Sequence, residues 1–321
     1  MKPLTALLPK VFARNLSAKK VFPREFHTAA EDLPDPNVLL APDGYYVYAT
    51  NTPGINVPVV FSADLQGFSL LGDAMPVLPR WVRRGFTWAP DVAEMGGRYV
   101  LYFTARLRRS GRQVIGVATS ERPEGPFVAA DRPLITMLEL GGAIDANVLI
   151  TAGRKRYLYW KNDGNAVGQA TQLWGAALSD DGLSLISDPV ALLTATEPWE
   201  RELVEAPQVI EGDGVFHLLY SCADFGDETY AVGDASGPTP LGPFHKTRNA
   251  PVLASHGRLA GPGHSHAFRT AAGHWQLAYH AWETGRCGYP KGRRALHFLP
   301  LQLDGGHLRL TFPEITAEAC D

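Results

Sequence analysis

Cysteines are few in this sequence and lie far apart. Cys222, Cys287 and Cys320 are odd in number, and their spacing matches neither a metal site nor a disulfide framework. We therefore expect ordinary buried or free thiols. A zinc domain and a small disulfide-stapled scaffold are both excluded.

The sequence also has no excess of charge of one sign. Thirty Lys and Arg residues face 33 Asp and Glu residues, which gives a formal net charge of −3, and no basic stripe is visible. Nucleic-acid binding proteins usually carry such a stripe, so we expect no nucleic-acid partner.

Long apolar runs are missing as well. The only apolar stretch near the N-terminus, Leu4 to Leu8, ends at Pro9 and Lys10. It is too short for the apolar region of a secretory signal and far too short to span a membrane. We expect a cytoplasmic protein with no membrane partner.

No long stretch shows helical periodicity, whereas strand-like patterns recur. In "FTWAPDVAEMGGRYVLYFTA", residues 86–105, a short apolar strand is followed by Gly96-Gly97 and an aromatic-rich strand. Paired glycines supply the positive φ of a tight hairpin turn. The pattern therefore predicts a β-hairpin with a small or polar opening.

This hairpin pattern occurs five times. Aligning the copies on the apolar residue that begins each first strand gives spacings of 54, 56, 61 and 58 residues, at Val38, Val92, Val148, Val209 and Ala267. Each copy has room for two further strands, and Gly-Pro-Phe endings recur at 125–127 and 242–244.

A repeat of this length is typical of a propeller blade. We predict an all-β fold, a five-bladed β-propeller with four antiparallel strands per blade, over residues 31–321. Residues 1–30 would be an extension that packs on the propeller or helps to close it. A sandwich of unrelated hairpins is the alternative, and the repeated endings argue against it.

The polar openings of the five copies predict one shared site. In a propeller the innermost strands line the central channel, so equivalent residues meet at one mouth. Three positions before the aligned residues stand Asp35, Ala89, Asp145, Ala206 and His264, and one position earlier stand Pro34, Trp88, Ile144, Glu205 and Gly263.

Three carboxylates, a tryptophan and a histidine would therefore meet around one funnel. Carboxylates gathered at a partly apolar mouth repel one another and separate their pKa values, which suits acid–base chemistry. Each residue alone has an ordinary structural interpretation: a turn at Asp35, a strand cap at Asp145, a solvated charge at Glu205 and core packing at Trp88.

With these residues in place, the sequence resembles glycoside hydrolase family 43 over about residues 30 to 305. The motifs that carry the resemblance are Asp35-Pro36, Trp88-Ala89-Pro90-Asp91, Ile144-Asp145, Glu205-Ala206-Pro207, Gly261-Pro262-Gly263-His264 and Gly292-Arg293. The resemblance implies a five-bladed propeller that removes arabinofuranosyl or xylosyl units with inversion. Asp145 is followed by Ala146, where the family usually has proline.

The resemblance also implies roles for the residues at the mouth. Asp35 is expected to be the general base, Glu205 the general acid, and Asp145 the carboxylate that orients the site and keeps the pKa of the acid raised. Trp88 is expected to form a wall of the sugar site. Arg293 is expected to contact the third carboxylate and the substrate, with the adjacent Arg294 as an alternative.

No cofactor is expected to be required for the chemistry. The resemblance implies that His264 lies beneath the sugar and faces a structural calcium ion in the channel, held largely through water. His266 competes for this role. Hard cations prefer oxygen ligands, so a single histidine is a weak signal.

The chemistry itself requires two carboxyl groups. Hydrolysis with inversion needs an acid and a base separated by about 6.5–9.5 Å, so that water fits on one face of the sugar. Blades one and four are not adjacent in a ring of five, so Asp35 and Glu205 would lie across the channel, which favours inversion.

The substrate is expected to be an oligosaccharide that contains arabinose or xylose. We favour an α-L-arabinofuranosidase acting on arabino-oligosaccharides or arabinose-substituted xylan fragments, with β-xylosidase and endo-1,5-α-L-arabinanase as alternatives. A non-catalytic glycan-binding propeller would lack one or more of the carboxylates, and a phosphorolytic enzyme would need a cationic phosphate cluster at the mouth.

Overall fold

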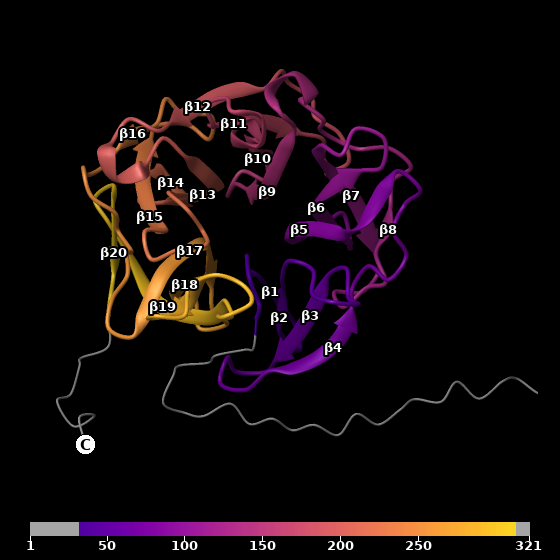
Figure 1. The fold of residues 1–321 in the computed structure, drawn as a ribbon, viewed down its shortest axis with the longest axis horizontal. Helices are drawn as coiled ribbons and strands as arrows, with labels where there is room; N and C mark the ends of the chain where they lie inside the picture. Colours follow the sequence, from indigo (N-terminus) through magenta and orange to yellow (C-terminus); the bar gives the residue numbers. More distant parts are fainter. Residues whose placement is uncertain (1–31, 313–321) are drawn as a thin grey trace, which may run out of the picture.

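The described part of this computed structural model, residues 32–312, consists of β-strands with three short 3-10 turns. Twenty strands form five sheets of four consecutive antiparallel strands. Figure 1 shows the five sheets arranged as blades around a central axis. The predicted all-β five-bladed propeller is confirmed. The predicted extension, residues 1–30, lies outside the described residues.

Each blade is a meander in which neighbouring strands follow one another in sequence. Blade one comprises β1 (Asn37–Ala41), β2 (Gly44–Tyr48), β3 (Pro58–Ser62) and β4 (Ser69–Asp73). Blade two comprises β5 (Val82–Met95), β6 (Arg98–Leu107), β7 (Gln113–Ser120) and β8 (Val128–Ala129). Blade three comprises β9 (Ala143–Ile150), β10 (Arg156–Asn162), β11 (Gln172–Leu178) and β12 (Val190–Thr194).

The last two blades follow the same order. Blade four comprises β13 (Val204–Gly212), β14 (Val215–Cys222), β15 (Ala231–Gly237) and β16 (His245–Lys246). Blade five comprises β17 (Leu259–Arg269), β18 (Trp275–Glu283), β19 (Ala295–Asp304) and β20 (His307–Leu310). The 3-10 turns are η1 (Leu138–Leu140), η2 (Gly164–Val167) and η3 (Pro198–Glu200).

The hairpin turn that we predicted from paired glycines is present. Gly96 and Gly97, between β5 and β6, have φ of 62° and 78°. A side chain is rarely stable in this left-handed region, whereas glycine pays no steric cost there. The sequence signal and the turn therefore have the same physical origin.

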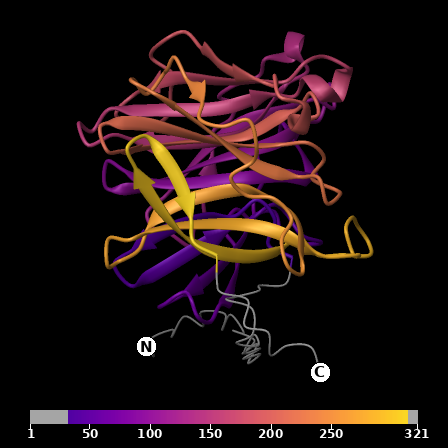
Figure 2. The same cartoon turned by 90° about the vertical axis from the view of Figure 1, so that its left-hand side faces the viewer.

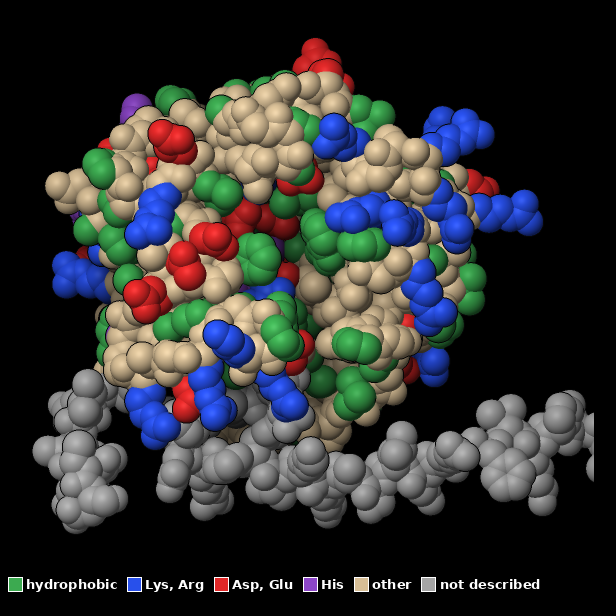
Figure 3. All heavy atoms as spheres, in the orientation of Figure 1, with side chains coloured by type: hydrophobic (Ala, Val, Ile, Leu, Met, Phe, Trp, Pro, Cys, Tyr) green, Lys and Arg blue, Asp and Glu red, His purple; other side chains and the backbone are tan. Residues whose placement is uncertain are grey.

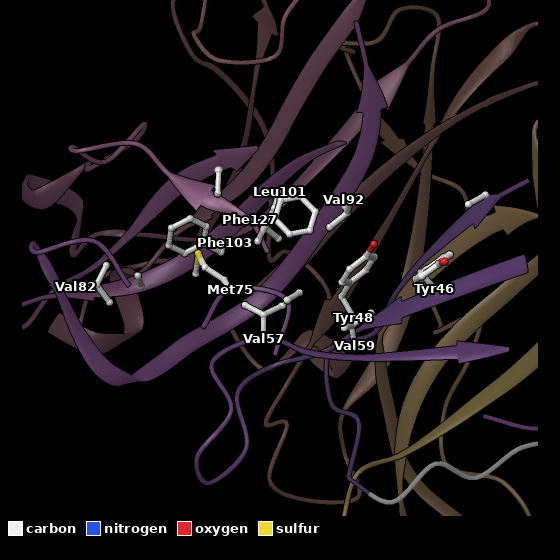
Figure 4. Packing of buried hydrophobic residues seen from close by; sticks show 14 residues of the cluster. Tyr46, Tyr48, Val57, Val59, Met75, Val82, Val92, Leu101, Phe103 and Phe127 are labelled. Carbon is white, nitrogen blue, oxygen red and sulfur yellow. The ribbon is translucent and has the colours of Figure 1, made fainter. Parts of the chain in front are cut away.

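The hydrophobic core lies between blades and joins them. One buried cluster combines Tyr48 and Val57 of blade one with Leu101 and Phe103 of blade two, and all four side chains are fully buried. Figure 4 shows them pointing toward one another between the two sheets. Burying one such side chain stabilises the fold by about 1.5–3 kcal/mol. The blades are thus held at fixed angles, which fixes the geometry of the central channel.

The ring closes between the first and last blades. Strand β1 contacts β17, and the backbone N–H of Leu33 donates to the carbonyl of Arg294 (3.0 Å). Figure 2 shows blade five from the side, with the loop between β18 and β19 projecting beyond the strand ends. That loop leads into Arg294 and so borders the mouth of the channel.

The described cysteines are free thiols, as predicted. Cys222 is a buried free thiol and Cys287 a half-buried free thiol, while Cys320 lies outside the described residues. Among residues 32–312, no helix is long and apolar enough to cross a membrane. The predicted cytoplasmic location stays a prediction, since the N-terminal residues on which it depends are not described.

Candidate active site

The five equivalent positions predicted from the repeat share one unusual backbone conformation. Each has a positive φ: Asp35 57°, Ala89 43°, Asp145 60°, Ala206 50° and His264 44°. A non-glycine residue in this region costs about 1 kcal/mol or more, and such residues cluster at functional sites. The same unusual backbone conformation therefore occurs at one equivalent position in all five blades.

The kinks are held by side chains of the preceding blade. In four blades the kinked residue donates its backbone N–H to a side chain at the equivalent position in or just after the second strand of the preceding blade: Ala89 to Thr50, Asp145 to Thr104, His264 to Ser221, and Asp35 to His280. The fifth junction differs. There Ala206 donates to Asp145 Oδ2 (3.1 Å), and the residue at the equivalent position is Lys161.

A second ring of links lies one layer deeper in the channel. Side chains one residue before the aligned apolar positions accept backbone N–H groups of the next blade: Asn37 from Val92, Asp91 from Val148, Gln208 from Ala267, and His266 from Val38. In the same ring Asn147 leaves its buried Oδ1 without a partner among the described residues. In both rings, therefore, the junction between blades three and four lacks the hydrogen bond that occurs at the equivalent position of the other four junctions.

Asp35 is a buried carboxylate surrounded by donors and cationic groups. Arg294 Nη1 donates to its Oδ1 (2.9 Å), Thr50 donates to its Oδ2, and His264 Nδ1 lies 3.5 Å from Oδ1. Burial acts to raise the pKa of Asp35, but the Arg294 cation, with His264 and the hydrogen bond from Thr50, outweighs it and lowers that pKa well below its usual value. Asp35 is therefore ionised throughout the neutral range.

His280 completes the surroundings of Asp35 as a neutral ring. Its Nδ1 accepts the backbone N–H of Asp35 (3.1 Å), so that nitrogen carries no proton. Burial, together with the Arg294 cation, lowers the pKa of His280 well below its usual value. The histidine thus supports the kink at Asp35 without adding charge.

Glu205 has a firm partner on each carboxylate oxygen. Lys161 Nζ lies 2.9 Å from Oε2, and the Tyr230 hydroxyl donates to Oε1 (2.7 Å). The side chain of Lys161 is 1% exposed and that of Glu205 12% exposed. Although burial acts to lower it, attraction to Glu205 and Asp145 raises the pKa of Lys161. The pair is therefore a buried ion pair on the wall of the channel.

The pKa of Asp145 depends on the charges of both other carboxylates. Burial raises the pKa of Asp145 to about 6; His264 opposes this rise, and the negative charges of Glu205 and Asp35 add to it. Its Oδ2 also accepts the backbone N–H of Ala206, next to Glu205 in the chain. Asp145 is thus able both to orient the Glu205 strand and to place a negative charge near it.

Trp88 and His264 occupy the positions in the repeat that we predicted to lie at the mouth. Trp88 is half-buried and packs edge-on against Phe86 (6.2 Å between ring centroids). The side chain of His264 is 16% exposed and faces Asp35. An indole face at this place can pack against the C–H face of a sugar.

The arginine at the site is Arg294, where our prediction preferred Arg293. Arg294 is buried and pairs with Asp35, whereas Arg293 is exposed. Neighbouring residues of an extended chain point to opposite sides, so only one of the two can face the channel. The partner also differs, because the expected contact was with Asp145 and the observed one is with Asp35.

A calcium ion at His264 stays a prediction. Among residues 32–312, no three His, Cys, Asp or Glu side chains are grouped so as to hold a metal ion. A calcium ion beside His264 would therefore be held mainly through water, as hard cations allow.

Two cavities lie along the inner strands. A narrow one of about 20 Å³ is lined by Asp145, His264 and His266 among others. A wider one of about 610 Å³ opens at the opposite end of the inner strands, and Asp91 and His266 border both. Burial raises the pKa of Asp91 to about 7. The roomier cavity is remote from Asp35 and Glu205, so we place the reacting centre at the carboxylate mouth.

Sequence reasoning missed several residues that complete the site. Lys161, Tyr230, Thr50 and His280 contact the two principal carboxylates but were not predicted. A signal was present: each copy has a polar residue at the same position in or just after its second strand, and four of these residues cap a kink. Lys161 is the member of this set with a charged side chain.

Comparison with known proteins now assigns the chain to a family. The model of glycosyl hydrolases family 43 matches residues 28–304. The chain belongs to glycoside hydrolase family 43. The three carboxylates at the mouth are those on which the resemblance was based, and the chain is accordingly a glycosidase that acts on a carbohydrate.

The relatives of this family 43 chain differ in the substrates that their names state. A β-D-galactofuranosidase of Aspergillus niger is 25% identical over 77% of this chain and 73% of its own length. A probable arabinan endo-1,5-α-L-arabinosidase of Aspergillus flavus is 28% identical over 74% of this chain and 77% of its own. A crystal structure of a thermostable family-43 glycoside hydrolase has a TM-score of 0.79 at 26% identity, over 89% of this chain and 95% of that one.

Proposed function

We propose that this family 43 chain is an inverting hydrolase that removes α-L-arabinofuranosyl units from arabino-oligosaccharides or arabinose-substituted xylan fragments. The observation that carries the proposal is the pair of buried carboxylates, Asp35 on blade one and Glu205 on blade four, each with its own set of partners. Blade five separates these two blades in the ring, which supports attack and departure on opposite faces of the sugar.

Inversion proceeds by a single displacement, in which Glu205 protonates the leaving oxygen. A general acid must hold its proton until the glycosidic bond breaks. Asp145 favours the protonated form of Glu205 by its negative charge, while Lys161 favours the ionised form that is left after transfer. Asp145 therefore helps Glu205 to hold its proton before the transfer, and Lys161 stabilises the carboxylate that remains after it.

In the same displacement Asp35 receives a proton from the attacking water. Arg294, with His264, keeps Asp35 ionised, which a base requires, and these groups also make it a weak base. Proton transfer is then late, when the forming bond to the oxocarbenium-like carbon has made the water acidic. Asp35 before that moment orients the water.

The arabinose specificity is supported by the relative whose name states arabinan as its substrate. The β-galactofuranosidase name also describes a furanose ring. β-Xylosidase and endo-arabinanase use the same carboxylate arrangement, so the substrate is decided by assay. The presence of all three carboxylates supports an enzyme over a non-catalytic glycan-binding propeller.

The test is a panel of p-nitrophenyl glycosides and linear arabinan, with and without phosphate. We expect release of p-nitrophenol from the α-L-arabinofuranoside to exceed release from the β-D-xyloside and β-D-galactofuranoside, with no stimulation by phosphate. The first sugar product should have the inverted anomeric configuration by proton NMR. Early appearance of the retained anomer would contradict the two-carboxylate mechanism, and a preference for the xyloside would contradict the arabinose assignment.

A further inference from the structure

An unusual concentration of arginine borders the proposed site on blade two. Residues 80–84 and 106–112 together contain seven arginines. Four of them, Arg83, Arg84, Arg106 and Arg112, are called the arginine rim here. Figure 3 shows Lys and Arg side chains gathered over blade two, beside the central hollow where acidic side chains are visible.

The rim belongs to the same end of the channel as the carboxylates. Arg83 precedes Trp88 on β5, and Arg106 follows Thr104 at the end of β6. Arg84 reaches the carbonyl of Gly54 on blade one (3.5 Å). The positive charges of Arg112 and Arg106 act on the buried Asp163, which lies next to the strand end that carries Lys161.

The rim is arranged with its positive charges close together. Arg83 and Arg106 are directly opposite one another on β5 and β6. Like charges in that position destabilise a strand pair. Burial and the neighbouring Arg83 both lower the pKa of Arg106. Among residues 32–312, none of the four rim arginines has an Asp or Glu within ion-pair distance. A bound anion would relieve this repulsion.

The central guanidinium is held in a defined orientation. Arg106 lies over the ring of Phe86 (3.6 Å to the centroid), and its Nε donates to Gln113 Oε1 (3.2 Å). Phe86 in turn packs against Trp88. A stacked guanidinium keeps its outer N–H groups free for two parallel bonds to a carboxylate. An aromatic sugar platform and an oriented anion receptor are therefore adjacent.

We propose that the arginine rim binds a carboxylate-bearing sugar, a uronic acid residue, in the part of the glycan that crosses blade two. This rests on the proposed function insofar as the glycan also reaches the carboxylates. A sugar ring would pack on Phe86 and Trp88 while its carboxylate pairs with Arg106 and Arg83. The substrate class is thereby an acidic, uronate-containing arabino- or xylo-oligosaccharide.

Binding is tested apart from hydrolysis. Titration calorimetry on Asp35→Asn uses trigalacturonate and a glucuronic-acid-substituted xylotriose, each compared with its uncharged methyl ester. We expect the acids to bind more tightly than the esters and to lose this advantage between about 20 and 200 mM salt, since exposed charges are screened over this range. Inorganic phosphate and sulfate serve as further ligands.

Rim variants identify the residues responsible. Arg106→Gln and Arg83→Gln should each weaken acid binding about fivefold, the size expected for one partly exposed charge pair. Arg106→Lys should restore only part of the loss, because lysine keeps the charge but not the planar stack. Arg98→Gln removes the same charge from the far end of the same strand β6, away from the mouth, and should leave binding unchanged.

The outcomes separate this inference from the proposed function. Acids that bind no better than their esters, or a loss in Arg98→Gln equal to that in Arg106→Gln, would overturn the rim as a uronate site. Displacement of both acids by equimolar phosphate or sulfate would overturn it as well, because the site would then accept any anion. Charge-dependent binding without hydrolysis of the arabinofuranoside would leave the rim in place and refute the arabinofuranosidase assignment alone.

Discussion

The ion pair between Lys161 and Glu205 offers a sharp test of the acid assignment. Lys161→Met removes the cation and keeps a side chain of similar length in the same buried space. Without the cation, ionised Glu205 is less favourable, so the carboxyl keeps its proton to higher pH. The alkaline limb of the pH–rate profile reports the group that must be protonated. We therefore expect that limb to move to higher pH.

The size of the shift follows from the geometry. Two unit charges separated by the observed 2.9 Å attract by about 6 kcal/mol at an effective dielectric constant of about 20, which is an upper limit. Opposite charges at such distances typically shift a titration by about 1–3 pH units. The side chains are 1% and 12% exposed, so solvent screens the pair little. We expect a shift of about 1–3 pH units.

The thermal stability of Lys161→Met should also depend on pH. Removing one partner of a buried pair costs about 3–5 kcal/mol when the other charge remains. Glu205 avoids this cost by taking a proton at low pH. Thermal denaturation of Lys161→Met should therefore show a larger loss of Tm at about pH 8 than at about pH 5.

The assay measures kcat/KM from about pH 4 to 10 with an arabinoside that has a poor leaving group. Lys161→Arg keeps the cation and should keep the limb near its original position. Tyr230→Phe removes the other hydrogen bond to Glu205 without a change of charge, and serves as a second control. An alkaline limb that stays in place, or moves to lower pH, in Lys161→Met would refute Glu205 as the titrating acid.

Four further predictions concern the same mouth. Asp35→Asn should abolish turnover and leave sugar binding largely intact, because an amide keeps the shape but takes no proton; calorimetry and rate measurements check this, and undiminished hydrolysis would remove Asp35 from the base role. Asp145→Asn removes a negative charge near Glu205, so the alkaline limb should move to lower pH; a limb that does not move would leave Asp145 a purely positional residue. Glu205→Gln should be partly rescued by substrates with very good leaving groups, and equal losses for good and poor leaving groups would mean that another residue is the acid. Chelation should lower the rate or Tm moderately if His264 faces a water-held calcium ion, and an unchanged protein would contradict that ion.

Much of the fold was predictable because its signals are local and repeated. The paired glycines, the alternation in strands such as 99–103 and the spacing near 57 residues each follow from chain geometry within one blade. The phase of the repeat also placed Asp35, Asp145 and Glu205 at one mouth. The positive φ shared by Asp35, Ala89, Asp145, Ala206 and His264 is the backbone counterpart of that phase.

The contacts between blades were not predictable in the same way. Lys161 occupies the position that Thr50, Thr104 and Ser221 hold in other blades, yet it pairs with Glu205 and caps no kink. The sequence of residues 156–162 does not indicate which side chain of the next blade lies beside Lys161. Such a partner becomes visible only when two strands more than 40 residues apart in the sequence lie side by side.

The sequence by itself determined the blade, the number of its copies and the carboxylates at the mouth, because hydrophobic alternation and turn chemistry act between residues close in the chain. Tertiary structure alone decided that Arg294 rather than Arg293 faces Asp35, that Lys161 pairs with Glu205, and that Arg106 lies on Phe86. These choices depend on the direction of single side chains and on desolvated charges brought together by ring closure. Coulomb interactions between buried groups depend on distance in space, and the linear sequence does not contain that distance.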